Sequence, residues 1–233
     1  MPWNFALTAD ATVDLDVLRT VFPSGDPMVK KTEEGHELLT DSIDPAASAG
    51  DAFRRATELL QQMTGFARTV DLQQGECRLE GTYASPAGDT GTVAAAATIH
   101  SRARVFPPSV TVGGNEAAPP LGPRIVQLAA TDQAVADLLQ LVSTHPRDWI
   151  TLYKLYEIVR AEVGRDGIES RGWATAADLD RFTASANHPG VSGLEARHAR
   201  LAGSSPTRTM ALDTAINLMS TVTNRFLVDR ATT

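Results

Sequence analysis

The chain has 233 residues, of which 42% are hydrophobic and 21% charged, the composition of an ordinary folded globular protein. Its single cysteine, Cys77, excludes an intramolecular disulfide and a thiolate metal cluster. The N-terminus has neither the basic nor the apolar stretch of a signal peptide, and the longest run of small apolar residues, 93–97, is too short to cross a bilayer. We therefore expect a cytoplasmic protein with no membrane contact.

The net charge of -7 is unevenly distributed along the chain. Residues 1–120 hold 9 Lys and Arg against 16 Asp and Glu, whereas residues 121–233 hold 12 of each. The acidic excess of the first part argues against its binding a phosphate backbone. A nucleic-acid ligand would have to bind the second part.

Alternation of apolar and polar residues predicts strands in the first part, and apolar residues at helical spacing predict the helices between them. In chain order we expect a strand over 3–8, a helix over 13–21, a hairpin of strands 28–33 and 36–43, a helix over 52–66, and strands over 77–83, 92–105 and 110–112. This order, β-α-β-β-α-β with extra strands, is that of a ferredoxin-like sandwich. The RNA-recognition fold shares the order, but the expected central strand at 36–39 carries no stacking aromatic residue, so we do not expect this part to bind RNA.

Three Gly and three Pro cluster in residues 113–123, which predicts a boundary between domains. The expected organisation is an α+β domain over 1–118, a Pro/Gly-rich linker over 119–130 and an all-α domain over 131–233. Apolar residues at helical spacing predict four helices in the last part: 132–144, 149–163, 175–186 and 212–226.

The segment 179–210 collects the polar groups that most resemble a site. It lies between two apolar-faced helices, and from Arg181 to Arg208 it holds four arginines against one carboxylate. Its candidate residues are Arg181, Asn187, His188, Glu195, Arg197, His198, Arg200 and Arg208. We expect no cofactor and no metal there, because no carboxylate or His cluster has usable ligand spacing.

The helical part, residues 131–228, resembles the HEPN superfamily, many of whose members are metal-independent ribonucleases or nucleotide-binding modules. The catalytic signature of that family is an Arg, usually followed by a polar residue, with a His four to six residues later. Arg181 and His188, with six residues between them, meet the spacing, but Phe182 stands where the family has a polar residue. Arg197-His198 has the polar second residue, but no later His exists in the chain.

What this resemblance implies is RNA cleavage at the Arg/His segment. Arg181 would hold the scissile phosphate and His188 or His198 would transfer the proton. Asn187 and Arg197 would orient these groups, and Arg200 and Arg208 would add to binding.

A structural interpretation stands beside the catalytic one. Asn-His-Pro-Gly at 187–190 is also the pattern of a helix end, and the charges around Glu195 are also typical of a solvated helix face. Tyr153 and Tyr156 continue an apolar stripe and are expected in the core. Glu76 and Glu80 near Cys77 would raise the pKa of its thiol, so we do not expect a nucleophile there.

Two hypotheses follow. In the first, the chain is a non-enzymatic interaction or regulatory protein, in which the N-terminal part binds a protein partner or a small ligand and the helical part forms a homo-oligomer. In the second, it is a HEPN-like ribonuclease or RNA-binding effector of a defence or stress system, a dimer with the arginine-rich segment at its interface.

Overall fold

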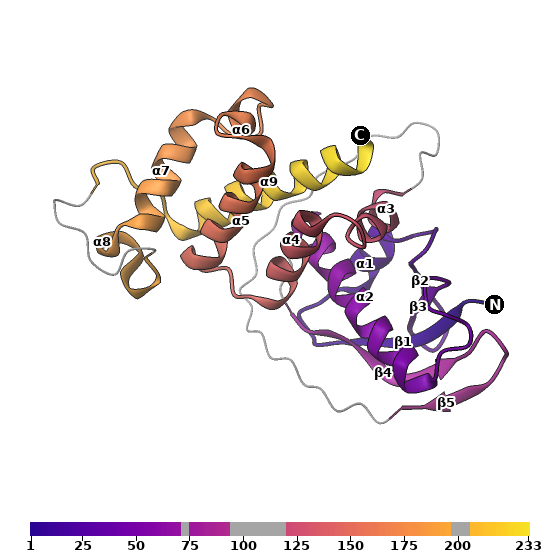
Figure 1. Ribbon diagram of the computed structural model, residues 1–233. Helices are drawn as coiled ribbons and strands as arrows, with labels where there is room; N and C mark the ends of the chain where they lie inside the picture. Colours follow the sequence, from indigo (N-terminus) through magenta and orange to yellow (C-terminus); the bar gives the residue numbers. More distant parts are fainter. Residues whose placement is uncertain (71–74, 94–119, 197–205) are drawn as a thin grey trace. The chain divides into compact units, whose positions relative to one another are not determined.

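The computed structural model describes residues 1–70, 75–93, 120–196 and 206–233. The protein is of the mixed α+β class, as predicted, with an antiparallel five-stranded sheet in its N-terminal part and helices in its C-terminal part (Figure 1). The chain divides into two compact units, Met1–Thr144 (unit 1) and His145–Thr233 (unit 2).

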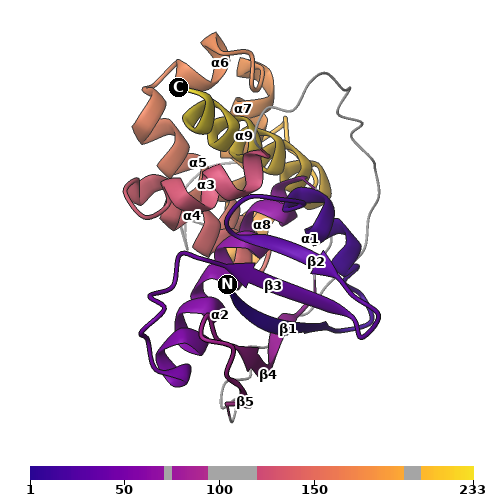
Figure 2. The same ribbon diagram turned by 90° about the vertical axis from the view of Figure 1, so that its right-hand side faces the viewer.

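The predicted order β-α-β-β-α-β opens unit 1, and a fifth strand and two helices follow it. The elements are β1 (Trp3–Ala9), α1 (Leu15–Val21), β2 (Met28–Lys31), β3 (His36–Thr40), α2 (Ala49–Val70), β4 (Cys77–Ala84), β5 (Thr90–Thr92), α3 (Leu121–Leu128) and α4 (Gln133–Thr144). The strands lie in the order β2-β3-β1-β4-β5, and all four neighbouring pairs are antiparallel (Figure 2).

The central strand β1 alternates between buried and half-buried residues, which is why its period is readable in the sequence. Trp3, Phe5 and Leu7 are buried on one face of the sheet. Phe5 pairs with Leu38 in β3 and contacts the ring of Phe53 in α2. This face and the two helices α1 and α2 therefore form the core of unit 1.

Helices α3 and α4 pack on α2 and belong to unit 1. A Cβ atom on Gly65 of α2 would lie 2.3 Å from the carbonyl oxygen of Leu139, so α2 and α4 cross in backbone contact. The stretch 119–130, expected as a linker, instead contains α3, and the boundary between the units falls between residues 144 and 145. Pro123 is tolerated in α3 because it lies in the first turn, where no intrahelical partner is lost.

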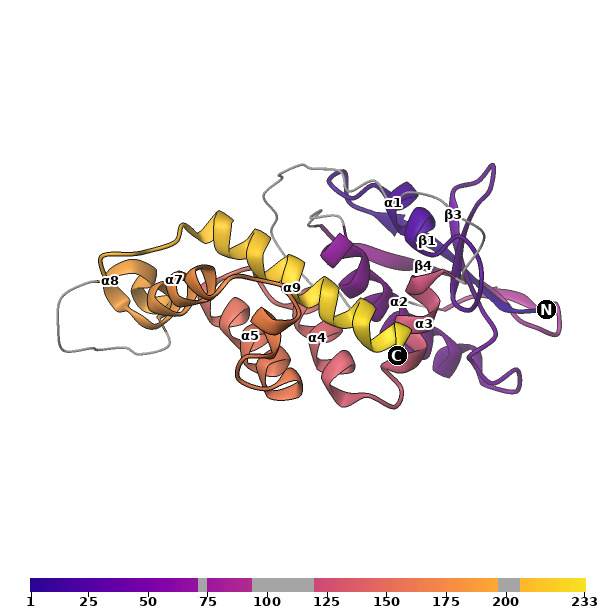
Figure 3. The ribbon, with the colours of Figure 1, turned by 90° about the horizontal axis from the view of Figure 1, so that it is seen from above.

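Unit 2 is helical throughout its described residues. Its elements are α5 (Trp149–Val163), α6 (Gly167–Ser170), α7 (Ala176–Asn187), α8 (Pro189–Ser192), the 3₁₀ turn η1 (Gly193–Glu195) and α9 (Leu212–Thr232). Helix α9 runs along α5 (Figure 3). The ring of Phe182 contacts three aromatic rings of α5, among them Tyr153 and Tyr156, so these tyrosines are core residues as predicted.

Part of the predicted second half of the sheet lies outside the described residues. Of the strand expected over 92–105, the structure describes β5 up to Thr92 and the following Val93; residues 94–105 and the strand expected over 110–112 are not among the described ones. Within the described ranges, no helix combines the length and the apolar character that a bilayer crossing requires.

Candidate functional site

A cavity opens in unit 1 between α1, α2 and the start of β4. Its volume is about 30 Å³, and its mouth is open to solvent. Its walls are mainly apolar and its polar groups are few, which is the usual character of a small-molecule site. The lining residues are Val13, Asp14, Val17, Leu18, Thr64, Ala67, Arg68, Gly75 and Cys77.

Local sequence explains how these side chains come to face one space. Asp14 caps the N-terminus of α1 by accepting from the backbone N–H of Asp16, and this places Val17 and Leu18 on the helix side that faces the cavity. Thr64 and Arg68 are four residues apart, with Ala67 between, so they share one face of α2. Gly75 leaves room for the side chains opposite it, because a Cβ there would lie 2.3 Å from a methyl group of Val13 and displace it.

Arg68 is the one cationic side chain among the cavity's described lining residues, and it is only 6% exposed. Its Nη1 donates to the carbonyl oxygens of Val142 (3.2 Å) and Ser143, and its Nη2 donates to the carbonyl oxygen of Gly75 (2.5 Å). Val142 and Ser143 lie in the last turn of α4, whose carbonyls lack intrahelical donors and carry the negative end of the helix dipole. Arg68 therefore joins the cavity wall to the end of α4.

The ionisation of the two titratable groups deepest in the cavity follows from burial. Burial lowers the pKa of Arg68 from its ordinary value, while Cys77 and Asp10 oppose that shift. Burial raises the pKa of Cys77 to about 12, with Arg68 acting against the shift and Asp10 adding to it. The thiol is therefore protonated at neutral pH. The predicted direction is confirmed, but its main cause is burial rather than the carboxylates of Glu76 and Glu80.

Of the sequence-predicted site residues, Arg181 lies in α7 and is bound to the first turn of its own helix. Its Nη2 donates to Asp178 Oδ1 at 2.5 Å. Asp178 also accepts from the hydroxyl of Thr175, whose Oγ accepts from the backbone N–H of Asp178, and together these contacts form the N-terminal cap of α7. Thr175 first, and then Arg181, hold the pKa of Asp178 below its ordinary value.

His188 stands between α7 and α8 and its ring caps the shorter helix. Nδ1 accepts from the backbone N–H of Gly190 at 3.0 Å, so the neutral ring carries its proton on Nε2. Nε2 of His188 and Oδ1 of Asn187 are buried and have no hydrogen-bond partner among the residues that the structure describes. Such atoms are uncommon in folded proteins and each requires an explanation.

Of the remaining predicted residues, the structure describes two, Arg208 and Glu195. Arg208 is exposed, beyond the gap at 197–205. Arg197, His198 and Arg200 lie outside the described residues. Glu195 is exposed in η1. Arg181 and His188 are seven residues apart, so their backbones lie about 10 Å apart along the helix axis. Their joint catalytic role stays a prediction.

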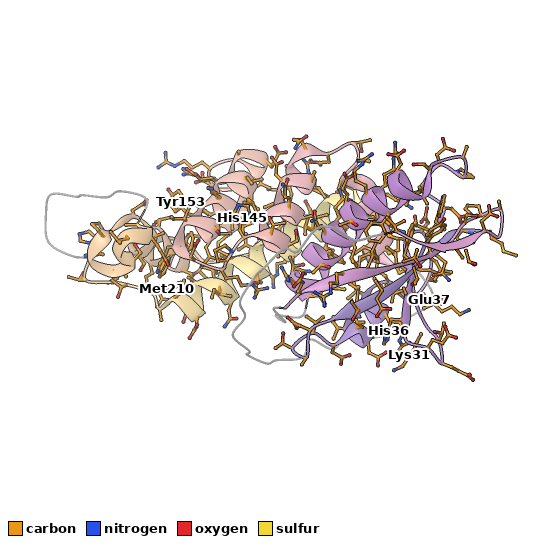
Figure 4. All side chains as sticks on the ribbon, turned by 90° about the horizontal axis from the view of Figure 1, so that it is seen from below. Lys31, His36, Glu37, His145, Tyr153 and Met210 are labelled. Atoms are coloured by element: carbon orange, nitrogen blue, oxygen red, sulfur yellow. The ribbon has the colours of Figure 1, made fainter. Side chains whose placement is uncertain are left out.

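A charge cluster on the surface of unit 1 was not predicted. Asp16 of α1 accepts from Lys31 Nζ (2.8 Å) and Arg19 Nε (2.9 Å), and lies 3.2 Å from His36 Nε2. These contacts, with Lys31 first, hold the pKa of Asp16 far below its ordinary value. Lys31 and His36 lie side by side at one end of the sheet, because β2 and β3 pair there (Figure 4). The cluster fastens α1 to the β2–β3 hairpin.

Among the described residues, no group of three or more His, Cys, Asp or Glu side chains is arranged to hold a metal ion. Comparison of the chain with protein-family models, with curated proteins and with solved structures found no match in any of the three.

Proposed function

We propose that the chain is a non-enzymatic binding and regulatory protein, whose unit 1 holds a small ligand in the cavity beside Arg68. The single observation that carries this proposal is the cavity itself, with mainly apolar walls and a buried guanidinium at its edge. Apolar walls contribute the free energy of burial, and the positive charge of Arg68 favours a group of opposite or partly negative charge. The ligand is therefore a small, mainly apolar molecule with a carboxylate or a carbonyl oxygen.

The state of the reactive groups supports binding rather than chemistry. Cys77 lines the cavity but its thiol is protonated, and the thiolate is the nucleophilic form. Outside the cavity, Arg181 is paired with Asp178 and Nδ1 of His188 accepts from a backbone N–H. Each of these side chains has a contact that accounts for its position in a folded protein.

A test uses thermal unfolding of the full chain with four-carbon probes: butanoate, butanamide and butylamine. At a concentration ten times its Kd, a ligand that binds only the folded state raises Tm by about 3 °C in a chain of this size. We expect this rise with the acid or the amide, and none with the amine, because the positive charge of Arg68 repels an ammonium group. No rise with any of the three would contradict the proposal.

Two variants test whether the probe binds in the cavity. Val17 lines the cavity and is half-buried, so Val17→Phe fills the space and should abolish the rise. Val70 at the end of α2 is 38% exposed and is not one of the lining residues, so Val70→Phe is the matched control and should keep the rise. Equal rises in both variants would place binding elsewhere.

One observation favours the ribonuclease alternative: the buried, unpartnered Nε2 of His188 and Oδ1 of Asn187 lie in the segment where the family resemblance places catalysis. The test is incubation with mixed RNA in the presence of EDTA, for the wild type and for Arg181→Ala and His188→Ala. Metal-independent cleavage that both substitutions abolish would support this function. Intact RNA at high protein concentration would discard it, and salt-dependent binding without cleavage would leave RNA binding alone.

Self-association of the helical part is a further element of the proposal. Ile150 and Leu194 are the large apolar side chains of the described part of unit 2 that are most exposed, at 42% and 104%. Exposed apolar surface favours association when it is contiguous. Light scattering after size-exclusion chromatography measures the mass directly, and a monomer at all concentrations would contradict this element.

A further inference from the structure

Arg68 contacts two different parts of unit 1. Its side chain lines the cavity, and one of its terminal nitrogens binds the carbonyl oxygen of Gly75, another lining residue. Its other terminal nitrogen binds the carbonyl oxygens of Val142 and Ser143. Ser143 is the penultimate residue of α4, and unit 1 ends at the next residue, Thr144. One rigid, buried side chain thus bridges the cavity wall and the last turn before the chain passes into unit 2.

From this bridge we infer that ligand occupancy of the cavity regulates the local stability of the segment that joins the two units. The inference rests on the proposed function, because it requires a ligand in the cavity beside Arg68. In this inference, a ligand bound in the cavity makes the last turn of α4 open less often.

The direction of the effect follows from linkage. When the last turn of α4 opens, Arg68 loses the acceptors that hold it, and the wall that it shares with Gly75 loses its fixed position. A ligand that binds only the closed arrangement shifts the population toward that arrangement. Coupling is reciprocal, so a substitution that makes the end of α4 open more often also lowers the affinity of the cavity for the ligand.

The guanidinium group is suited to this role because of its shape. Its donors lie in a flat, rigid fork, so Arg68 can hold acceptors on opposite sides at the same time. A lysine ammonium is a compact charge on a flexible stem and cannot span both sites in one geometry. Arg68→Lys therefore keeps the charge and removes the bridge. Arg54, which is 59% exposed on the same helix and pairs with Asp51 and Glu58, provides the matched control Arg54→Lys.

The experiment is hydrogen–deuterium exchange of the full chain, followed in a peptide that covers residues 140–148, with butanoate as the probe and its binding measured on the same sample by the shift in Tm. At ten times the Kd of butanoate, exchange in this peptide should slow about tenfold, because the open state is depleted by that factor. Without ligand, Arg68→Lys should speed exchange there about tenfold, while Arg54→Lys leaves it unchanged.

The outcomes separate the two claims. Binding together with slower exchange at 140–148 supports the inference. Binding of butanoate with unchanged exchange there overturns the inference and leaves the proposed function standing. No binding of butanoate overturns the proposed function, and the inference with it. If Arg68→Lys does not fold, the comparison of wild-type exchange with and without butanoate still tests the inference.

Discussion

In unit 1, Arg68 binds carbonyl oxygens 74 and 75 residues away, whereas in unit 2 Arg181 binds Asp178, three residues back on its own helix. The same contrast holds for the histidines. His36 contacts Asp16, 20 residues away, while His188 accepts from Gly190, two residues away. Local contacts serve to end and cap helices, but distant contacts bring separate elements to a common space. The distant contacts of Arg68 lie beside the cavity of unit 1 that we propose as the ligand site, although the sequence concentrates arginines in unit 2.

The largest expected effect concerns the extent of unit 1. A fragment of residues 1–144 should unfold cooperatively on its own, because it keeps α3 and α4 on α2. A fragment of residues 1–118 exposes the face of α2 that Leu139 covers and should show no cooperative transition by circular dichroism. Equal cooperativity in the two fragments would show that α4 is not part of the core of unit 1.

The second prediction concerns the reactivity of the cavity. With a pKa of about 12 against an ordinary 9.0, Cys77 at pH 8 has a thiolate fraction lower by about 1000-fold than a free thiol. Alkylation of the folded chain by iodoacetamide should be slower than alkylation of the chain in concentrated urea by about this factor. Similar rates would mean that Cys77 is neither buried nor protonated as described.

The third prediction probes the crossing of α2 and α4 without truncation. Gly65→Ala places a Cβ against the carbonyl of Leu139 and should lower the free energy of unfolding by about 3 kcal/mol. The control is Gly50→Ala, where nothing lies within 4 Å of the new Cβ, and it should be neutral or stabilising by up to about 1 kcal/mol. Urea unfolding measures both, and equal stabilities would refute the close crossing.

The fourth prediction tests the local role of His188 in unit 2. Removing its ring from the N-terminus of α8 should cost about 1 kcal/mol, the usual value of a helix cap. His188→Ala is compared with Arg208→Ala, which removes an exposed side chain and should leave stability unchanged. If stability is the same in both variants, the cap does not contribute to the stability of the fold. That result would favour a functional role for the His188 ring.

The smallest effect is expected at the surface cluster of unit 1. Lys31, Arg19 and His36 lower the pKa of Asp16 from 3.8, so the carboxylate stabilises the fold above pH 4, and this contribution is lost as the pH falls toward the lowered pKa. Asp16→Asn should be slightly less stable than the wild type at pH 5, and the difference should shrink at pH 2. A constant difference in urea midpoint would exclude the charge as its cause.

Hydrophobic periodicity predicted most of the elements correctly, because strands and helices are local patterns. The strand at β1 and the helices α2, α5, α7 and α9 follow directly from it. Helix α3 was mistaken for a linker because Gly122 and Pro123 are usually loop residues. Here Pro123 sits in a first turn, and Gly122 is needed because a Cβ would lie 2.6 Å from the carbonyl oxygen of Val21. That contact joins residues a hundred positions apart and leaves no local pattern.

The cavity was not predicted for the same physical reason. Val17, Ala67 and Cys77 belong to three separate elements, and only the packing of α1 and α2 on the sheet brings them together. Arg68 was not predicted as a site residue: it lies beyond the helix expected over 52–66, and nothing in the neighbouring sequence indicates that its partners are Val142 and Ser143. The Arg/His segment, in contrast, attracted attention through local composition, and its described members Arg181 and His188 make local contacts.

The proposed ligand site is tested most directly by titrating the full, isotope-labelled chain with butanoate and following amide chemical shifts in NMR spectra. Binding in the cavity should give saturable shifts at Val17, Ala67 and Cys77, which Val17→Phe removes and Val70→Phe keeps. Shifts confined to residues 181–208, or no saturable shifts at all, would contradict it.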